Sequence, residues 1–190
     1  VMGIGSNLSE CLLKSVRSLE IGVCHLHMPK FDNMSETELL DYIKEFKDDN
    51  LFAVAQLLRL GVSVEKLHEV TKITAYFLEN IKTIVEMENT LKQNPNDEKC
   101  LRDAKEMGFS DKFIAKLWET DELSVYNKRK ECSITPSFRM VDTLHTGKYI
   151  AYLYSSYNGK NDSRLTDKKK IIVLGAGPIR IGQGVEFDYS

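Results

Sequence analysis

At residues 51–58 the sequence reads Leu51-Phe52-Ala53-Val54-Ala55-Gln56-Leu57-Leu58, a run that is apolar at every position but one. Asp49 stands before this run and Gly61 follows it. A helix that is apolar all round is typical of a domain core, and a glycine just beyond such a run favours a helix stop. The run therefore predicts a helix that is buried on all sides and ends before Gly61.

Helix signals continue on both sides of this run. Ser35 and Glu38 have the spacing of a capping box. The apolar face expected behind them consists of Leu39, Leu40, Ile43 and Phe46. Ser63 is expected to cap a short helix that carries Val64, Leu67 and Val70. A longer helix is indicated by Ile73, Phe77, Ile81, Ile84 and Leu91, ending before Asn94-Pro95.

Three further helices are expected downstream. Asn96 can start the first, and Gly108 can end it in a Schellman motif with Phe109 as its hydrophobic contact. Ser110 is expected to cap the second, and Thr120 to cap the third, which continues towards Lys130. Residues 35–130 are thus predicted to be nearly all helix joined by short turns.

The two ends of the chain differ from this helical stretch in composition and in the structure that they predict. Near the N-terminus, Asn7 can cap a helix with Glu10 at the capping-box position, and residues 21–34 have the composition of a loop. The apolar face of that helix is expected to hold Leu8, Cys11, Leu12, Val16 and Leu19. Near the C-terminus, residues 138–143 and 149–154 favour extended structure, and Ile171–Leu174 resemble a buried parallel strand. Because the chain starts at Val1 and stops soon after a glycine loop, we expect both ends to be cut from something longer.

Composition excludes several classes of protein. The 190 residues are 42% hydrophobic and 28% charged, and the formal net charge is −2. A nearly neutral chain lacks the basic footprint of a nucleic-acid or anionic-membrane binder. We find no run of about 20 apolar residues and no signal-peptide pattern, so no membrane contact is expected. The four cysteines are scattered, which favours reduced thiols in a cytoplasmic protein over a disulfide framework.

Few residues of the sequence suggest a catalytic, cofactor-binding or metal-binding site. The strongest pattern is the glycine loop that begins Gly175-Ala176-Gly177, but a dinucleotide fingerprint would need glycine where Arg180 stands. Cys24-His25-Leu26-His27 could suggest a metal, yet the other histidines and cysteines are distant in sequence, so we interpret this stretch as a polar loop. No arrangement typical of a nucleophile with its base, of paired catalytic carboxylates or of a Walker loop is visible. On the residues alone we expect no catalytic, cofactor-binding or metal residue.

One alternative is a DNA-binding regulator that uses residues 108–131 as a helix-turn-helix. Charge argues against it, because residues 96–132 carry eight Lys or Arg and nine Asp or Glu. The helix that would enter the major groove opens with Asp121 and Glu122, which phosphates repel.

A resemblance covers essentially the whole chain. The run from Ile172 to Tyr189, with its Gly175-Ala176-Gly177-Pro178 loop followed by Arg180 and Gly184, resembles the large subunit of carbamoyl phosphate synthetase where its second synthetase half begins. Val1–Gly5 and Lys14–Glu20 are similar to the end of the first ATP-grasp half. The run Gly108–Lys112, Val141-Asp142-Thr143 and Tyr154–Tyr157 resemble landmarks of the helical segment between the halves. The family usually has arginine where Ser6 stands, and the region after Thr143 also departs from its pattern.

The resemblance implies a mostly α fold, namely a multi-helix oligomerisation domain followed by a short strand and glycine loop from a Rossmann-like pre-ATP-grasp domain. It also implies the domain bounds. Residues 1–20 would end the first ATP-grasp half, 21–158 would form the helical domain, 159–169 a linker, and 170–190 the start of the second half.

The resemblance further implies a function for the parent enzyme. That ligase is a glutamine-hydrolysing carbamoyl-phosphate synthase, which uses two ATP with Mg or Mn, for pyrimidine synthesis, arginine synthesis or both. The implied partners are the rest of the large subunit, a glutaminase subunit or domain, and further copies in an oligomer. By motif match, Gly184 and Glu186 would line the carbamate tunnel of the second half. We expect the chain itself to be inactive and to hold no cofactor.

Overall fold

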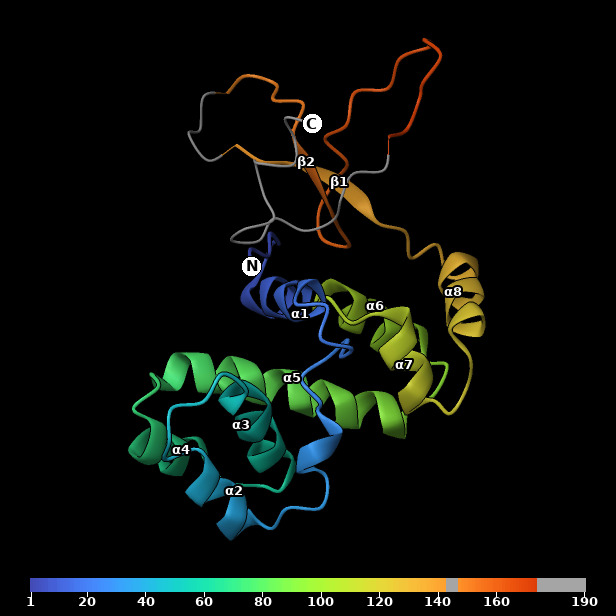
Figure 1. Ribbon diagram of the computed structural model, residues 1–190. Helices are drawn as coiled ribbons and strands as arrows, with labels where there is room; N and C mark the ends of the chain where they lie inside the picture. Colours follow the sequence, from blue (N-terminus) through green and yellow to red (C-terminus); the bar gives the residue numbers. More distant parts are fainter. Residues whose placement is uncertain (143–146, 174–190) are drawn as a thin grey trace.

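The computed structural model describes residues 1–142 and 147–173, which form eight α-helices, one 3₁₀ helix and a two-stranded sheet (Figure 1). The helices are α1 (Leu8–Ser18), α2 (Glu36–Tyr42), α3 (Asn50–Arg59), α4 (Val64–Thr71), α5 (Ala75–Gln93), α6 (Glu98–Glu106), α7 (Asp111–Leu117) and α8 (Glu122–Glu131). The 3₁₀ helix is η1 (Pro29–Phe31), and the strands are β1 (Ser137–Met140) and β2 (Leu153–Ser156). The predicted mostly α fold is confirmed.

Helix α5 is the centre of the helical body. It contacts α3 and α4 on one side and α1, α6 and α7 on the other, while α8 packs on α7 (Figure 1). Leu78, Ile84 and Leu91 on α5 are fully buried among these neighbours. The predicted all-apolar helix is α3, which is buried at every position from Phe52 to Leu58 except Gln56. The core therefore forms where the most apolar helix meets the longest one.

Most of the predicted helix ends are confirmed. Ser35 and Glu38 form a reciprocal capping box, and Ser63 and Ser110 each accept a hydrogen bond from the third residue of their helix. Gly61 and Gly108 both have positive φ and end α3 and α6. At Gly108 the motif is complete, because the amide of the buried Phe109 donates to the Ala104 carbonyl at 3.0 Å.

Two of the predicted caps are wrong by one residue. Asp97 caps α6 by accepting from the Cys100 amide at 2.7 Å, whereas Asn96 lies in the preceding turn with φ of 62°. Asp121 caps α8 by accepting from the Ser124 amide at 2.9 Å, whereas Thr120 belongs to the turn that ends α7, where its amide donates to the Ala115 carbonyl. In both cases the preceding turn occupies the predicted residue, so its neighbour becomes the cap.

The apolar face predicted for residues 35–46 is wrong at its last member. Helix α2 ends at Tyr42, and the Phe46 side chain beyond it is fully exposed. The chain turns here because the Tyr42 hydroxyl donates to the Asp49 carboxylate at 2.9 Å, which brings the start of α3 back to α2. Asp49, engaged with Tyr42 and Lys30, makes no side-chain cap on α3. Phe77, also predicted for an apolar face, is half exposed.

The two strands form an antiparallel pair in which Met140 faces Leu153 and Ser137 faces Ser156. We refer to residues 137–142 and 147–158 as the hairpin. The first strand begins where the sequence predicted extended structure, but the second lies later than the predicted 149–154. Asn161 and Asp162 beyond the hairpin bond to the amides of Phe138 and Met140.

The predicted strand at Ile171–Leu174 is wrong over the residues that the structure describes. Ile171, Ile172 and Val173 are exposed, and the sheet of the described ranges contains only β1 and β2. An isolated strand is marginal in water because its backbone groups lack partners. Leu174 and the glycine loop, with Gly184 and Glu186, lie outside the described residues. Among the residues described, no helix is long and apolar enough to cross a membrane.

Candidate functional site at the junction of α1 and the hairpin

Helix α1 begins as the sequence predicts. Asn7 accepts from the Glu10 amide at 2.8 Å, which is the expected cap. The reciprocal bond of the capping box is displaced by one residue, because the Glu10 carboxylate accepts from the Ser6 amide at 2.7 Å. This displacement directs the Glu10 side chain towards the residues that precede the helix.

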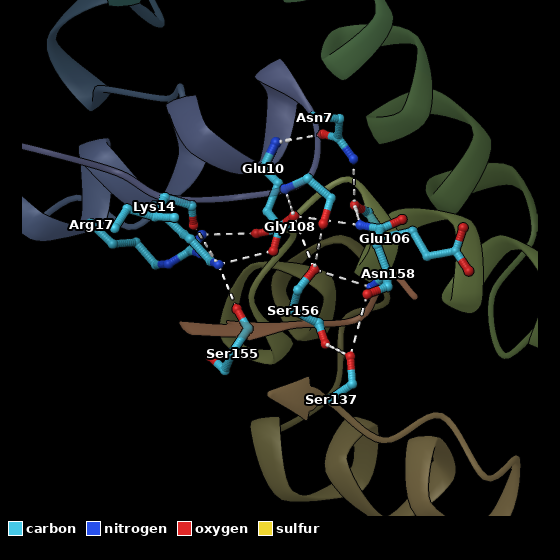
Figure 2. Close-up of polar contacts among 12 residues, drawn as sticks. Asn7, Glu10, Lys14, Arg17, Glu106, Gly108, Ser137, Ser155, Ser156 and Asn158 are labelled. Atoms are coloured by element: carbon cyan, nitrogen blue, oxygen red, sulfur yellow. Dashed lines mark hydrogen bonds and ion pairs between the residues drawn. The ribbon is translucent and has the colours of Figure 1, made fainter. Parts of the chain in front are cut away.

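The Glu10 carboxylate of α1 bonds to the residues before the helix and to the hairpin, whose Ser156 and Asn158 are labelled in Figure 2. Its side chain is buried although it is acidic, and its Oε2 atom accepts from the hairpin as well as from Ser6. The two hairpin donors are the Ser156 hydroxyl at 3.1 Å and the Asn158 amide at 3.4 Å. The Ser6 and Ser156 hydroxyls also lie 3.3 Å apart. A buried carboxylate is stable only when its oxygens are bonded, and this one is bonded across the chain.

Lys14, the cation of the ion pair, bonds to the same two segments as Glu10. Its ammonium lies 2.9 Å from Glu10 Oε1 and donates to the Ile4 carbonyl at 2.8 Å and to the Ser155 carbonyl at 2.5 Å. The three N–H groups of a lysine are then all used. Each member of the Glu10–Lys14 pair therefore contacts both the residues before α1 and the hairpin.

The end of α6 completes this junction. The Glu106 carbonyl accepts from the side-chain amides of Asn7 at 3.0 Å and Asn158 at 2.7 Å. The Arg17 guanidinium donates to the Gly108 carbonyl at 2.9 Å. Carbonyls at a helix C-terminus lack partners within the helix, so α6 offers acceptors to both segments. We call the contacts of Glu10 and Lys14, together with this end of α6, the junction.

The polar groups of the junction bond segments of the chain to one another. The donors of Lys14 and the acceptors of Glu10 are spent on backbone and side-chain partners within the chain. A pocket of about 510 Å³ beside it is lined by Met2–Ile4, α1 residues and Tyr152–Ser155. Both cations that line this pocket, Lys14 and Arg17, donate to backbone carbonyls of the chain.

The loop considered for a metal contributes instead to the core. His25 is buried and stacks on Phe113 with ring centroids 3.7 Å apart. Its Nε2 lies 3.0 Å from the Glu88 carboxylate, which Arg59 also contacts through two bonds of 2.8 Å. Within residues 1–142 and 147–173, no group of three or more His, Cys, Asp or Glu side chains could hold a metal ion.

This buried cluster has perturbed ionisation. Burial alone would raise the pKa of Glu88, but hydrogen bonds from Arg59 and His25 and their charges lower that pKa to about 2. Burial lowers the pKa of His25, with Glu88 opposing the shift. A neutral His25 must carry its proton on Nε2 to donate to an ionised Glu88. The cluster is a buried structural network that joins residues 21–34 to α3, α5 and α7.

The helix pair considered for DNA binding is α7 with α8. Arg129, in the middle of the basic run of α8, is buried and lies 3.1 Å from Asp111 on α7. Asp111 also pairs with the buried Lys105 at 2.6 Å. The central cation of the basic run is thus used to pack the two helices, and nothing in the described structure supports the DNA-binding alternative.

The sequence alone indicated only part of the junction. Asn7 and Glu10 were expected as cap residues, while the roles of Lys14, Ser155 and Asn158 were missed. An available signal was an acidic residue amid the apolar positions of α1, since a carboxylate there needs a partner from elsewhere in the fold.

Together, fold and junction define a helical domain whose N-terminal segment is bonded to the hairpin that follows its last helix. A family model described as carbamoyl-phosphate synthetase large chain, oligomerisation domain, matches residues 1–133. A second, described as carbamoyl phosphate synthase preATP-grasp domain, matches residues 167–190. The first match covers more than half of the chain, so the chain belongs to the carbamoyl-phosphate synthetase large chain family. The resemblance inferred from the sequence is therefore confirmed.

Proposed function

We propose that this chain is the linker and oligomerisation domain between the two synthetic halves of a glutamine-hydrolysing carbamoyl-phosphate synthase, a ligase. In that enzyme the first half makes carboxyphosphate and then carbamate, and the second half phosphorylates carbamate, each with one ATP and Mg or Mn. The proposed partners are the rest of the large chain, a glutaminase subunit or domain, and further copies. The proposed location is the cytoplasm. The enzyme would serve pyrimidine synthesis, arginine synthesis or both.

One observation carries the linker role: the residues that lead into the helical body are bonded directly to the hairpin that leads out of it. Ser6 lies beside Ser156, and the Glu10–Lys14 pair contacts both segments. The N-terminus and the hairpin lie at the same end of the molecule (Figure 1). A domain built this way keeps its two flanking units in one place relative to each other. This is what transfer of an unstable intermediate requires.

We further propose that the chain itself catalyses nothing. Its buried ion pairs hold segments of the chain together. The proposed tunnel residues Gly184 and Glu186 belong to the start of the second half. In the large chain, their roles would be to leave space beside the loop and to place a carboxylate at a helix start.

The linker role is tested by replacing residues 21–158 of the large chain with a flexible linker of matching span. We expect each half to keep its own ATP-dependent partial reaction, because each has its own active site. Synthesis of carbamoyl phosphate from ammonia should be lost, and the protein should sediment as a smaller species. Retention of full synthesis would refute the linker role, and an unchanged sedimentation coefficient would refute the oligomerisation role.

A further inference from the structure

The Glu10–Lys14 pair differs from the other ion pairs of consecutive helical turns in the described structure. Lys82 and Glu86 on α5 have the same spacing but lie 3.9 Å apart, and both side chains are exposed. Glu10 is 1% exposed, and its pair with Lys14 is 2.9 Å long. An exposed pair contributes little to stability, whereas a buried one that also accepts other bonds is costly to break.

Each member of the pair also bonds to both the N-terminal segment and the hairpin. Glu10 Oε2 alone accepts from Ser6 in the N-terminal segment and from Ser156 and Asn158 in the hairpin. On the other side, Lys14 reaches the carbonyls of Ile4 and Ser155. Both charges are therefore needed at once. Without Lys14, the Ile4 and Ser155 carbonyls and Glu10 Oε1 each lose a donor.

The hairpin has few other attachments to the helical body. Tyr157 packs against the core, with Lys105 4.7 Å from its ring centroid, and Asn158 also donates to the Glu106 carbonyl. Apart from the buried Ser156, the strand residues are half-buried or exposed, and each strand has only the other as its sheet partner in the described residues. A two-stranded hairpin is marginally stable alone in water. Its position therefore depends on the packing of Tyr157 and on the few polar contacts at its end.

From these observations we propose that the Glu10–Lys14 pair is a charge-held latch, which fixes the outgoing hairpin to the incoming segment and can be released without unfolding the helical body. Glu10 and Lys14 are positioning residues, since they act through the segments that they hold. In the large chain, and resting on the proposed function, the latch would set the relative placement of the two synthetic halves. Its loss would uncouple them.

Hydrogen exchange on the 190-residue chain tests the latch itself. In Glu10→Gln and Lys14→Met, amides of β1 and β2 should exchange about tenfold faster or more, because charge-assisted bonds are lost, while α5 amides exchange as before. Glu86→Gln is the matched control and should change neither. A second route avoids α1 altogether: the double variant Ser156→Ala, Asn158→Ala should also release the hairpin. Unchanged hairpin exchange in these variants, or equal acceleration in α5, would overturn the proposal.

The coupling role needs the large chain that carries this segment. With Glu10→Gln, bicarbonate-dependent ATP hydrolysis and phosphorylation of added carbamate should remain at the unmodified rate. The ATP consumed per carbamoyl phosphate formed from ammonia should rise, because carbamate would escape between the halves. An unchanged ratio with a loosened hairpin would overturn the latch as a coupling device and leave the linker function standing. Failure of the unmodified large chain to make carbamoyl phosphate would instead refute the proposed function.

Discussion

Gly108 lies directly against the backbone of Glu10, ninety-eight positions earlier in the chain: a Cβ at Gly108 would come within 2.8 Å of the Glu10 Cα atom. Gly108 also has φ of 91°, in the left-handed region that other residues rarely adopt. This position therefore requires glycine twice, once for the turn that ends α6 and once for the approach of α1.

Gly108→Ala should lower the free energy of unfolding by about 2–5 kcal/mol, because conformational strain adds to a clash with backbone that cannot move cheaply. Gly61→Ala is the control. Its φ is 89°, but nothing lies within 4 Å of its Cβ position, so only strain of about 1–2 kcal/mol is expected. Urea denaturation of both variants measures the difference. Equal losses would mean that α1 adapts to the added methyl group.

Stability should fall in acid through Glu88. Its pKa is about 2 in the folded state against 4.5 when unfolded, so its contribution is present above pH 4.5 and is lost as the pH falls towards 2. The linked free energy is about 3 kcal/mol at neutral pH. The pKa of His25 is lowered from 6.5 by burial. The stability contributed by its neutral form is therefore also lost as the pH falls below about 6.5.

Chemical denaturation between pH 7 and pH 2 measures this dependence. In Glu88→Gln the decrease between pH 4.5 and pH 2 should be clearly shallower, because the group that takes up the proton is gone. The same slope in both proteins would show that other carboxylates account for the acid sensitivity.

Asp111→Asn should cost about 3–5 kcal/mol, because it leaves the buried cations Lys105 and Arg129 without their shared carboxylate. Asp41→Asn provides the comparison, since Asp41 pairs with Lys44 on the surface and both side chains are more than half exposed. That change should cost less than about 1 kcal/mol. Thermal unfolding followed by circular dichroism would rank the two, and a similar cost for both would contradict the structural role given to Asp111.

The chain alone should not bind ATP. Its glycine loop does not have the Walker pattern, and Arg180 stands where a dinucleotide fingerprint needs glycine. Calorimetric titration with Mg-ATP should give only heats of dilution. A saturable heat at micromolar concentration would contradict this expectation.

Gly184→Phe in the large chain should block coupled synthesis. A phenylalanine ring would have no space if the carbamate tunnel passes beside this residue. Bicarbonate-dependent ATP hydrolysis and phosphorylation of added carbamate should continue, since each half keeps its own site. Equal loss of all three activities would point to misfolding of the loop, and unchanged synthesis would remove Gly184 and Glu186 from the tunnel.

The positions of the helices could be predicted from the sequence, because helix signals are local. A serine before an apolar run, a glycine after it and the spacing of leucines act within a few residues, as at Ser35, Ser63 and Gly61. These signals were reliable where the flanking turns were simple. They were wrong by one residue at Asn96 and Thr120, where the neighbouring turn had already used the cap position.

Which polar groups are buried, and which partners they bond to, depends on the tertiary structure. Nothing near Glu10 in sequence predicts Ser156 or Asn158 as its partner, and nothing near His25 predicts Glu88. Such pairs depend on contacts between residues far apart in the chain, and their energy comes from removing both groups from water together. The helices follow from local preference, whereas the connection between the two ends of the helical body follows from packing.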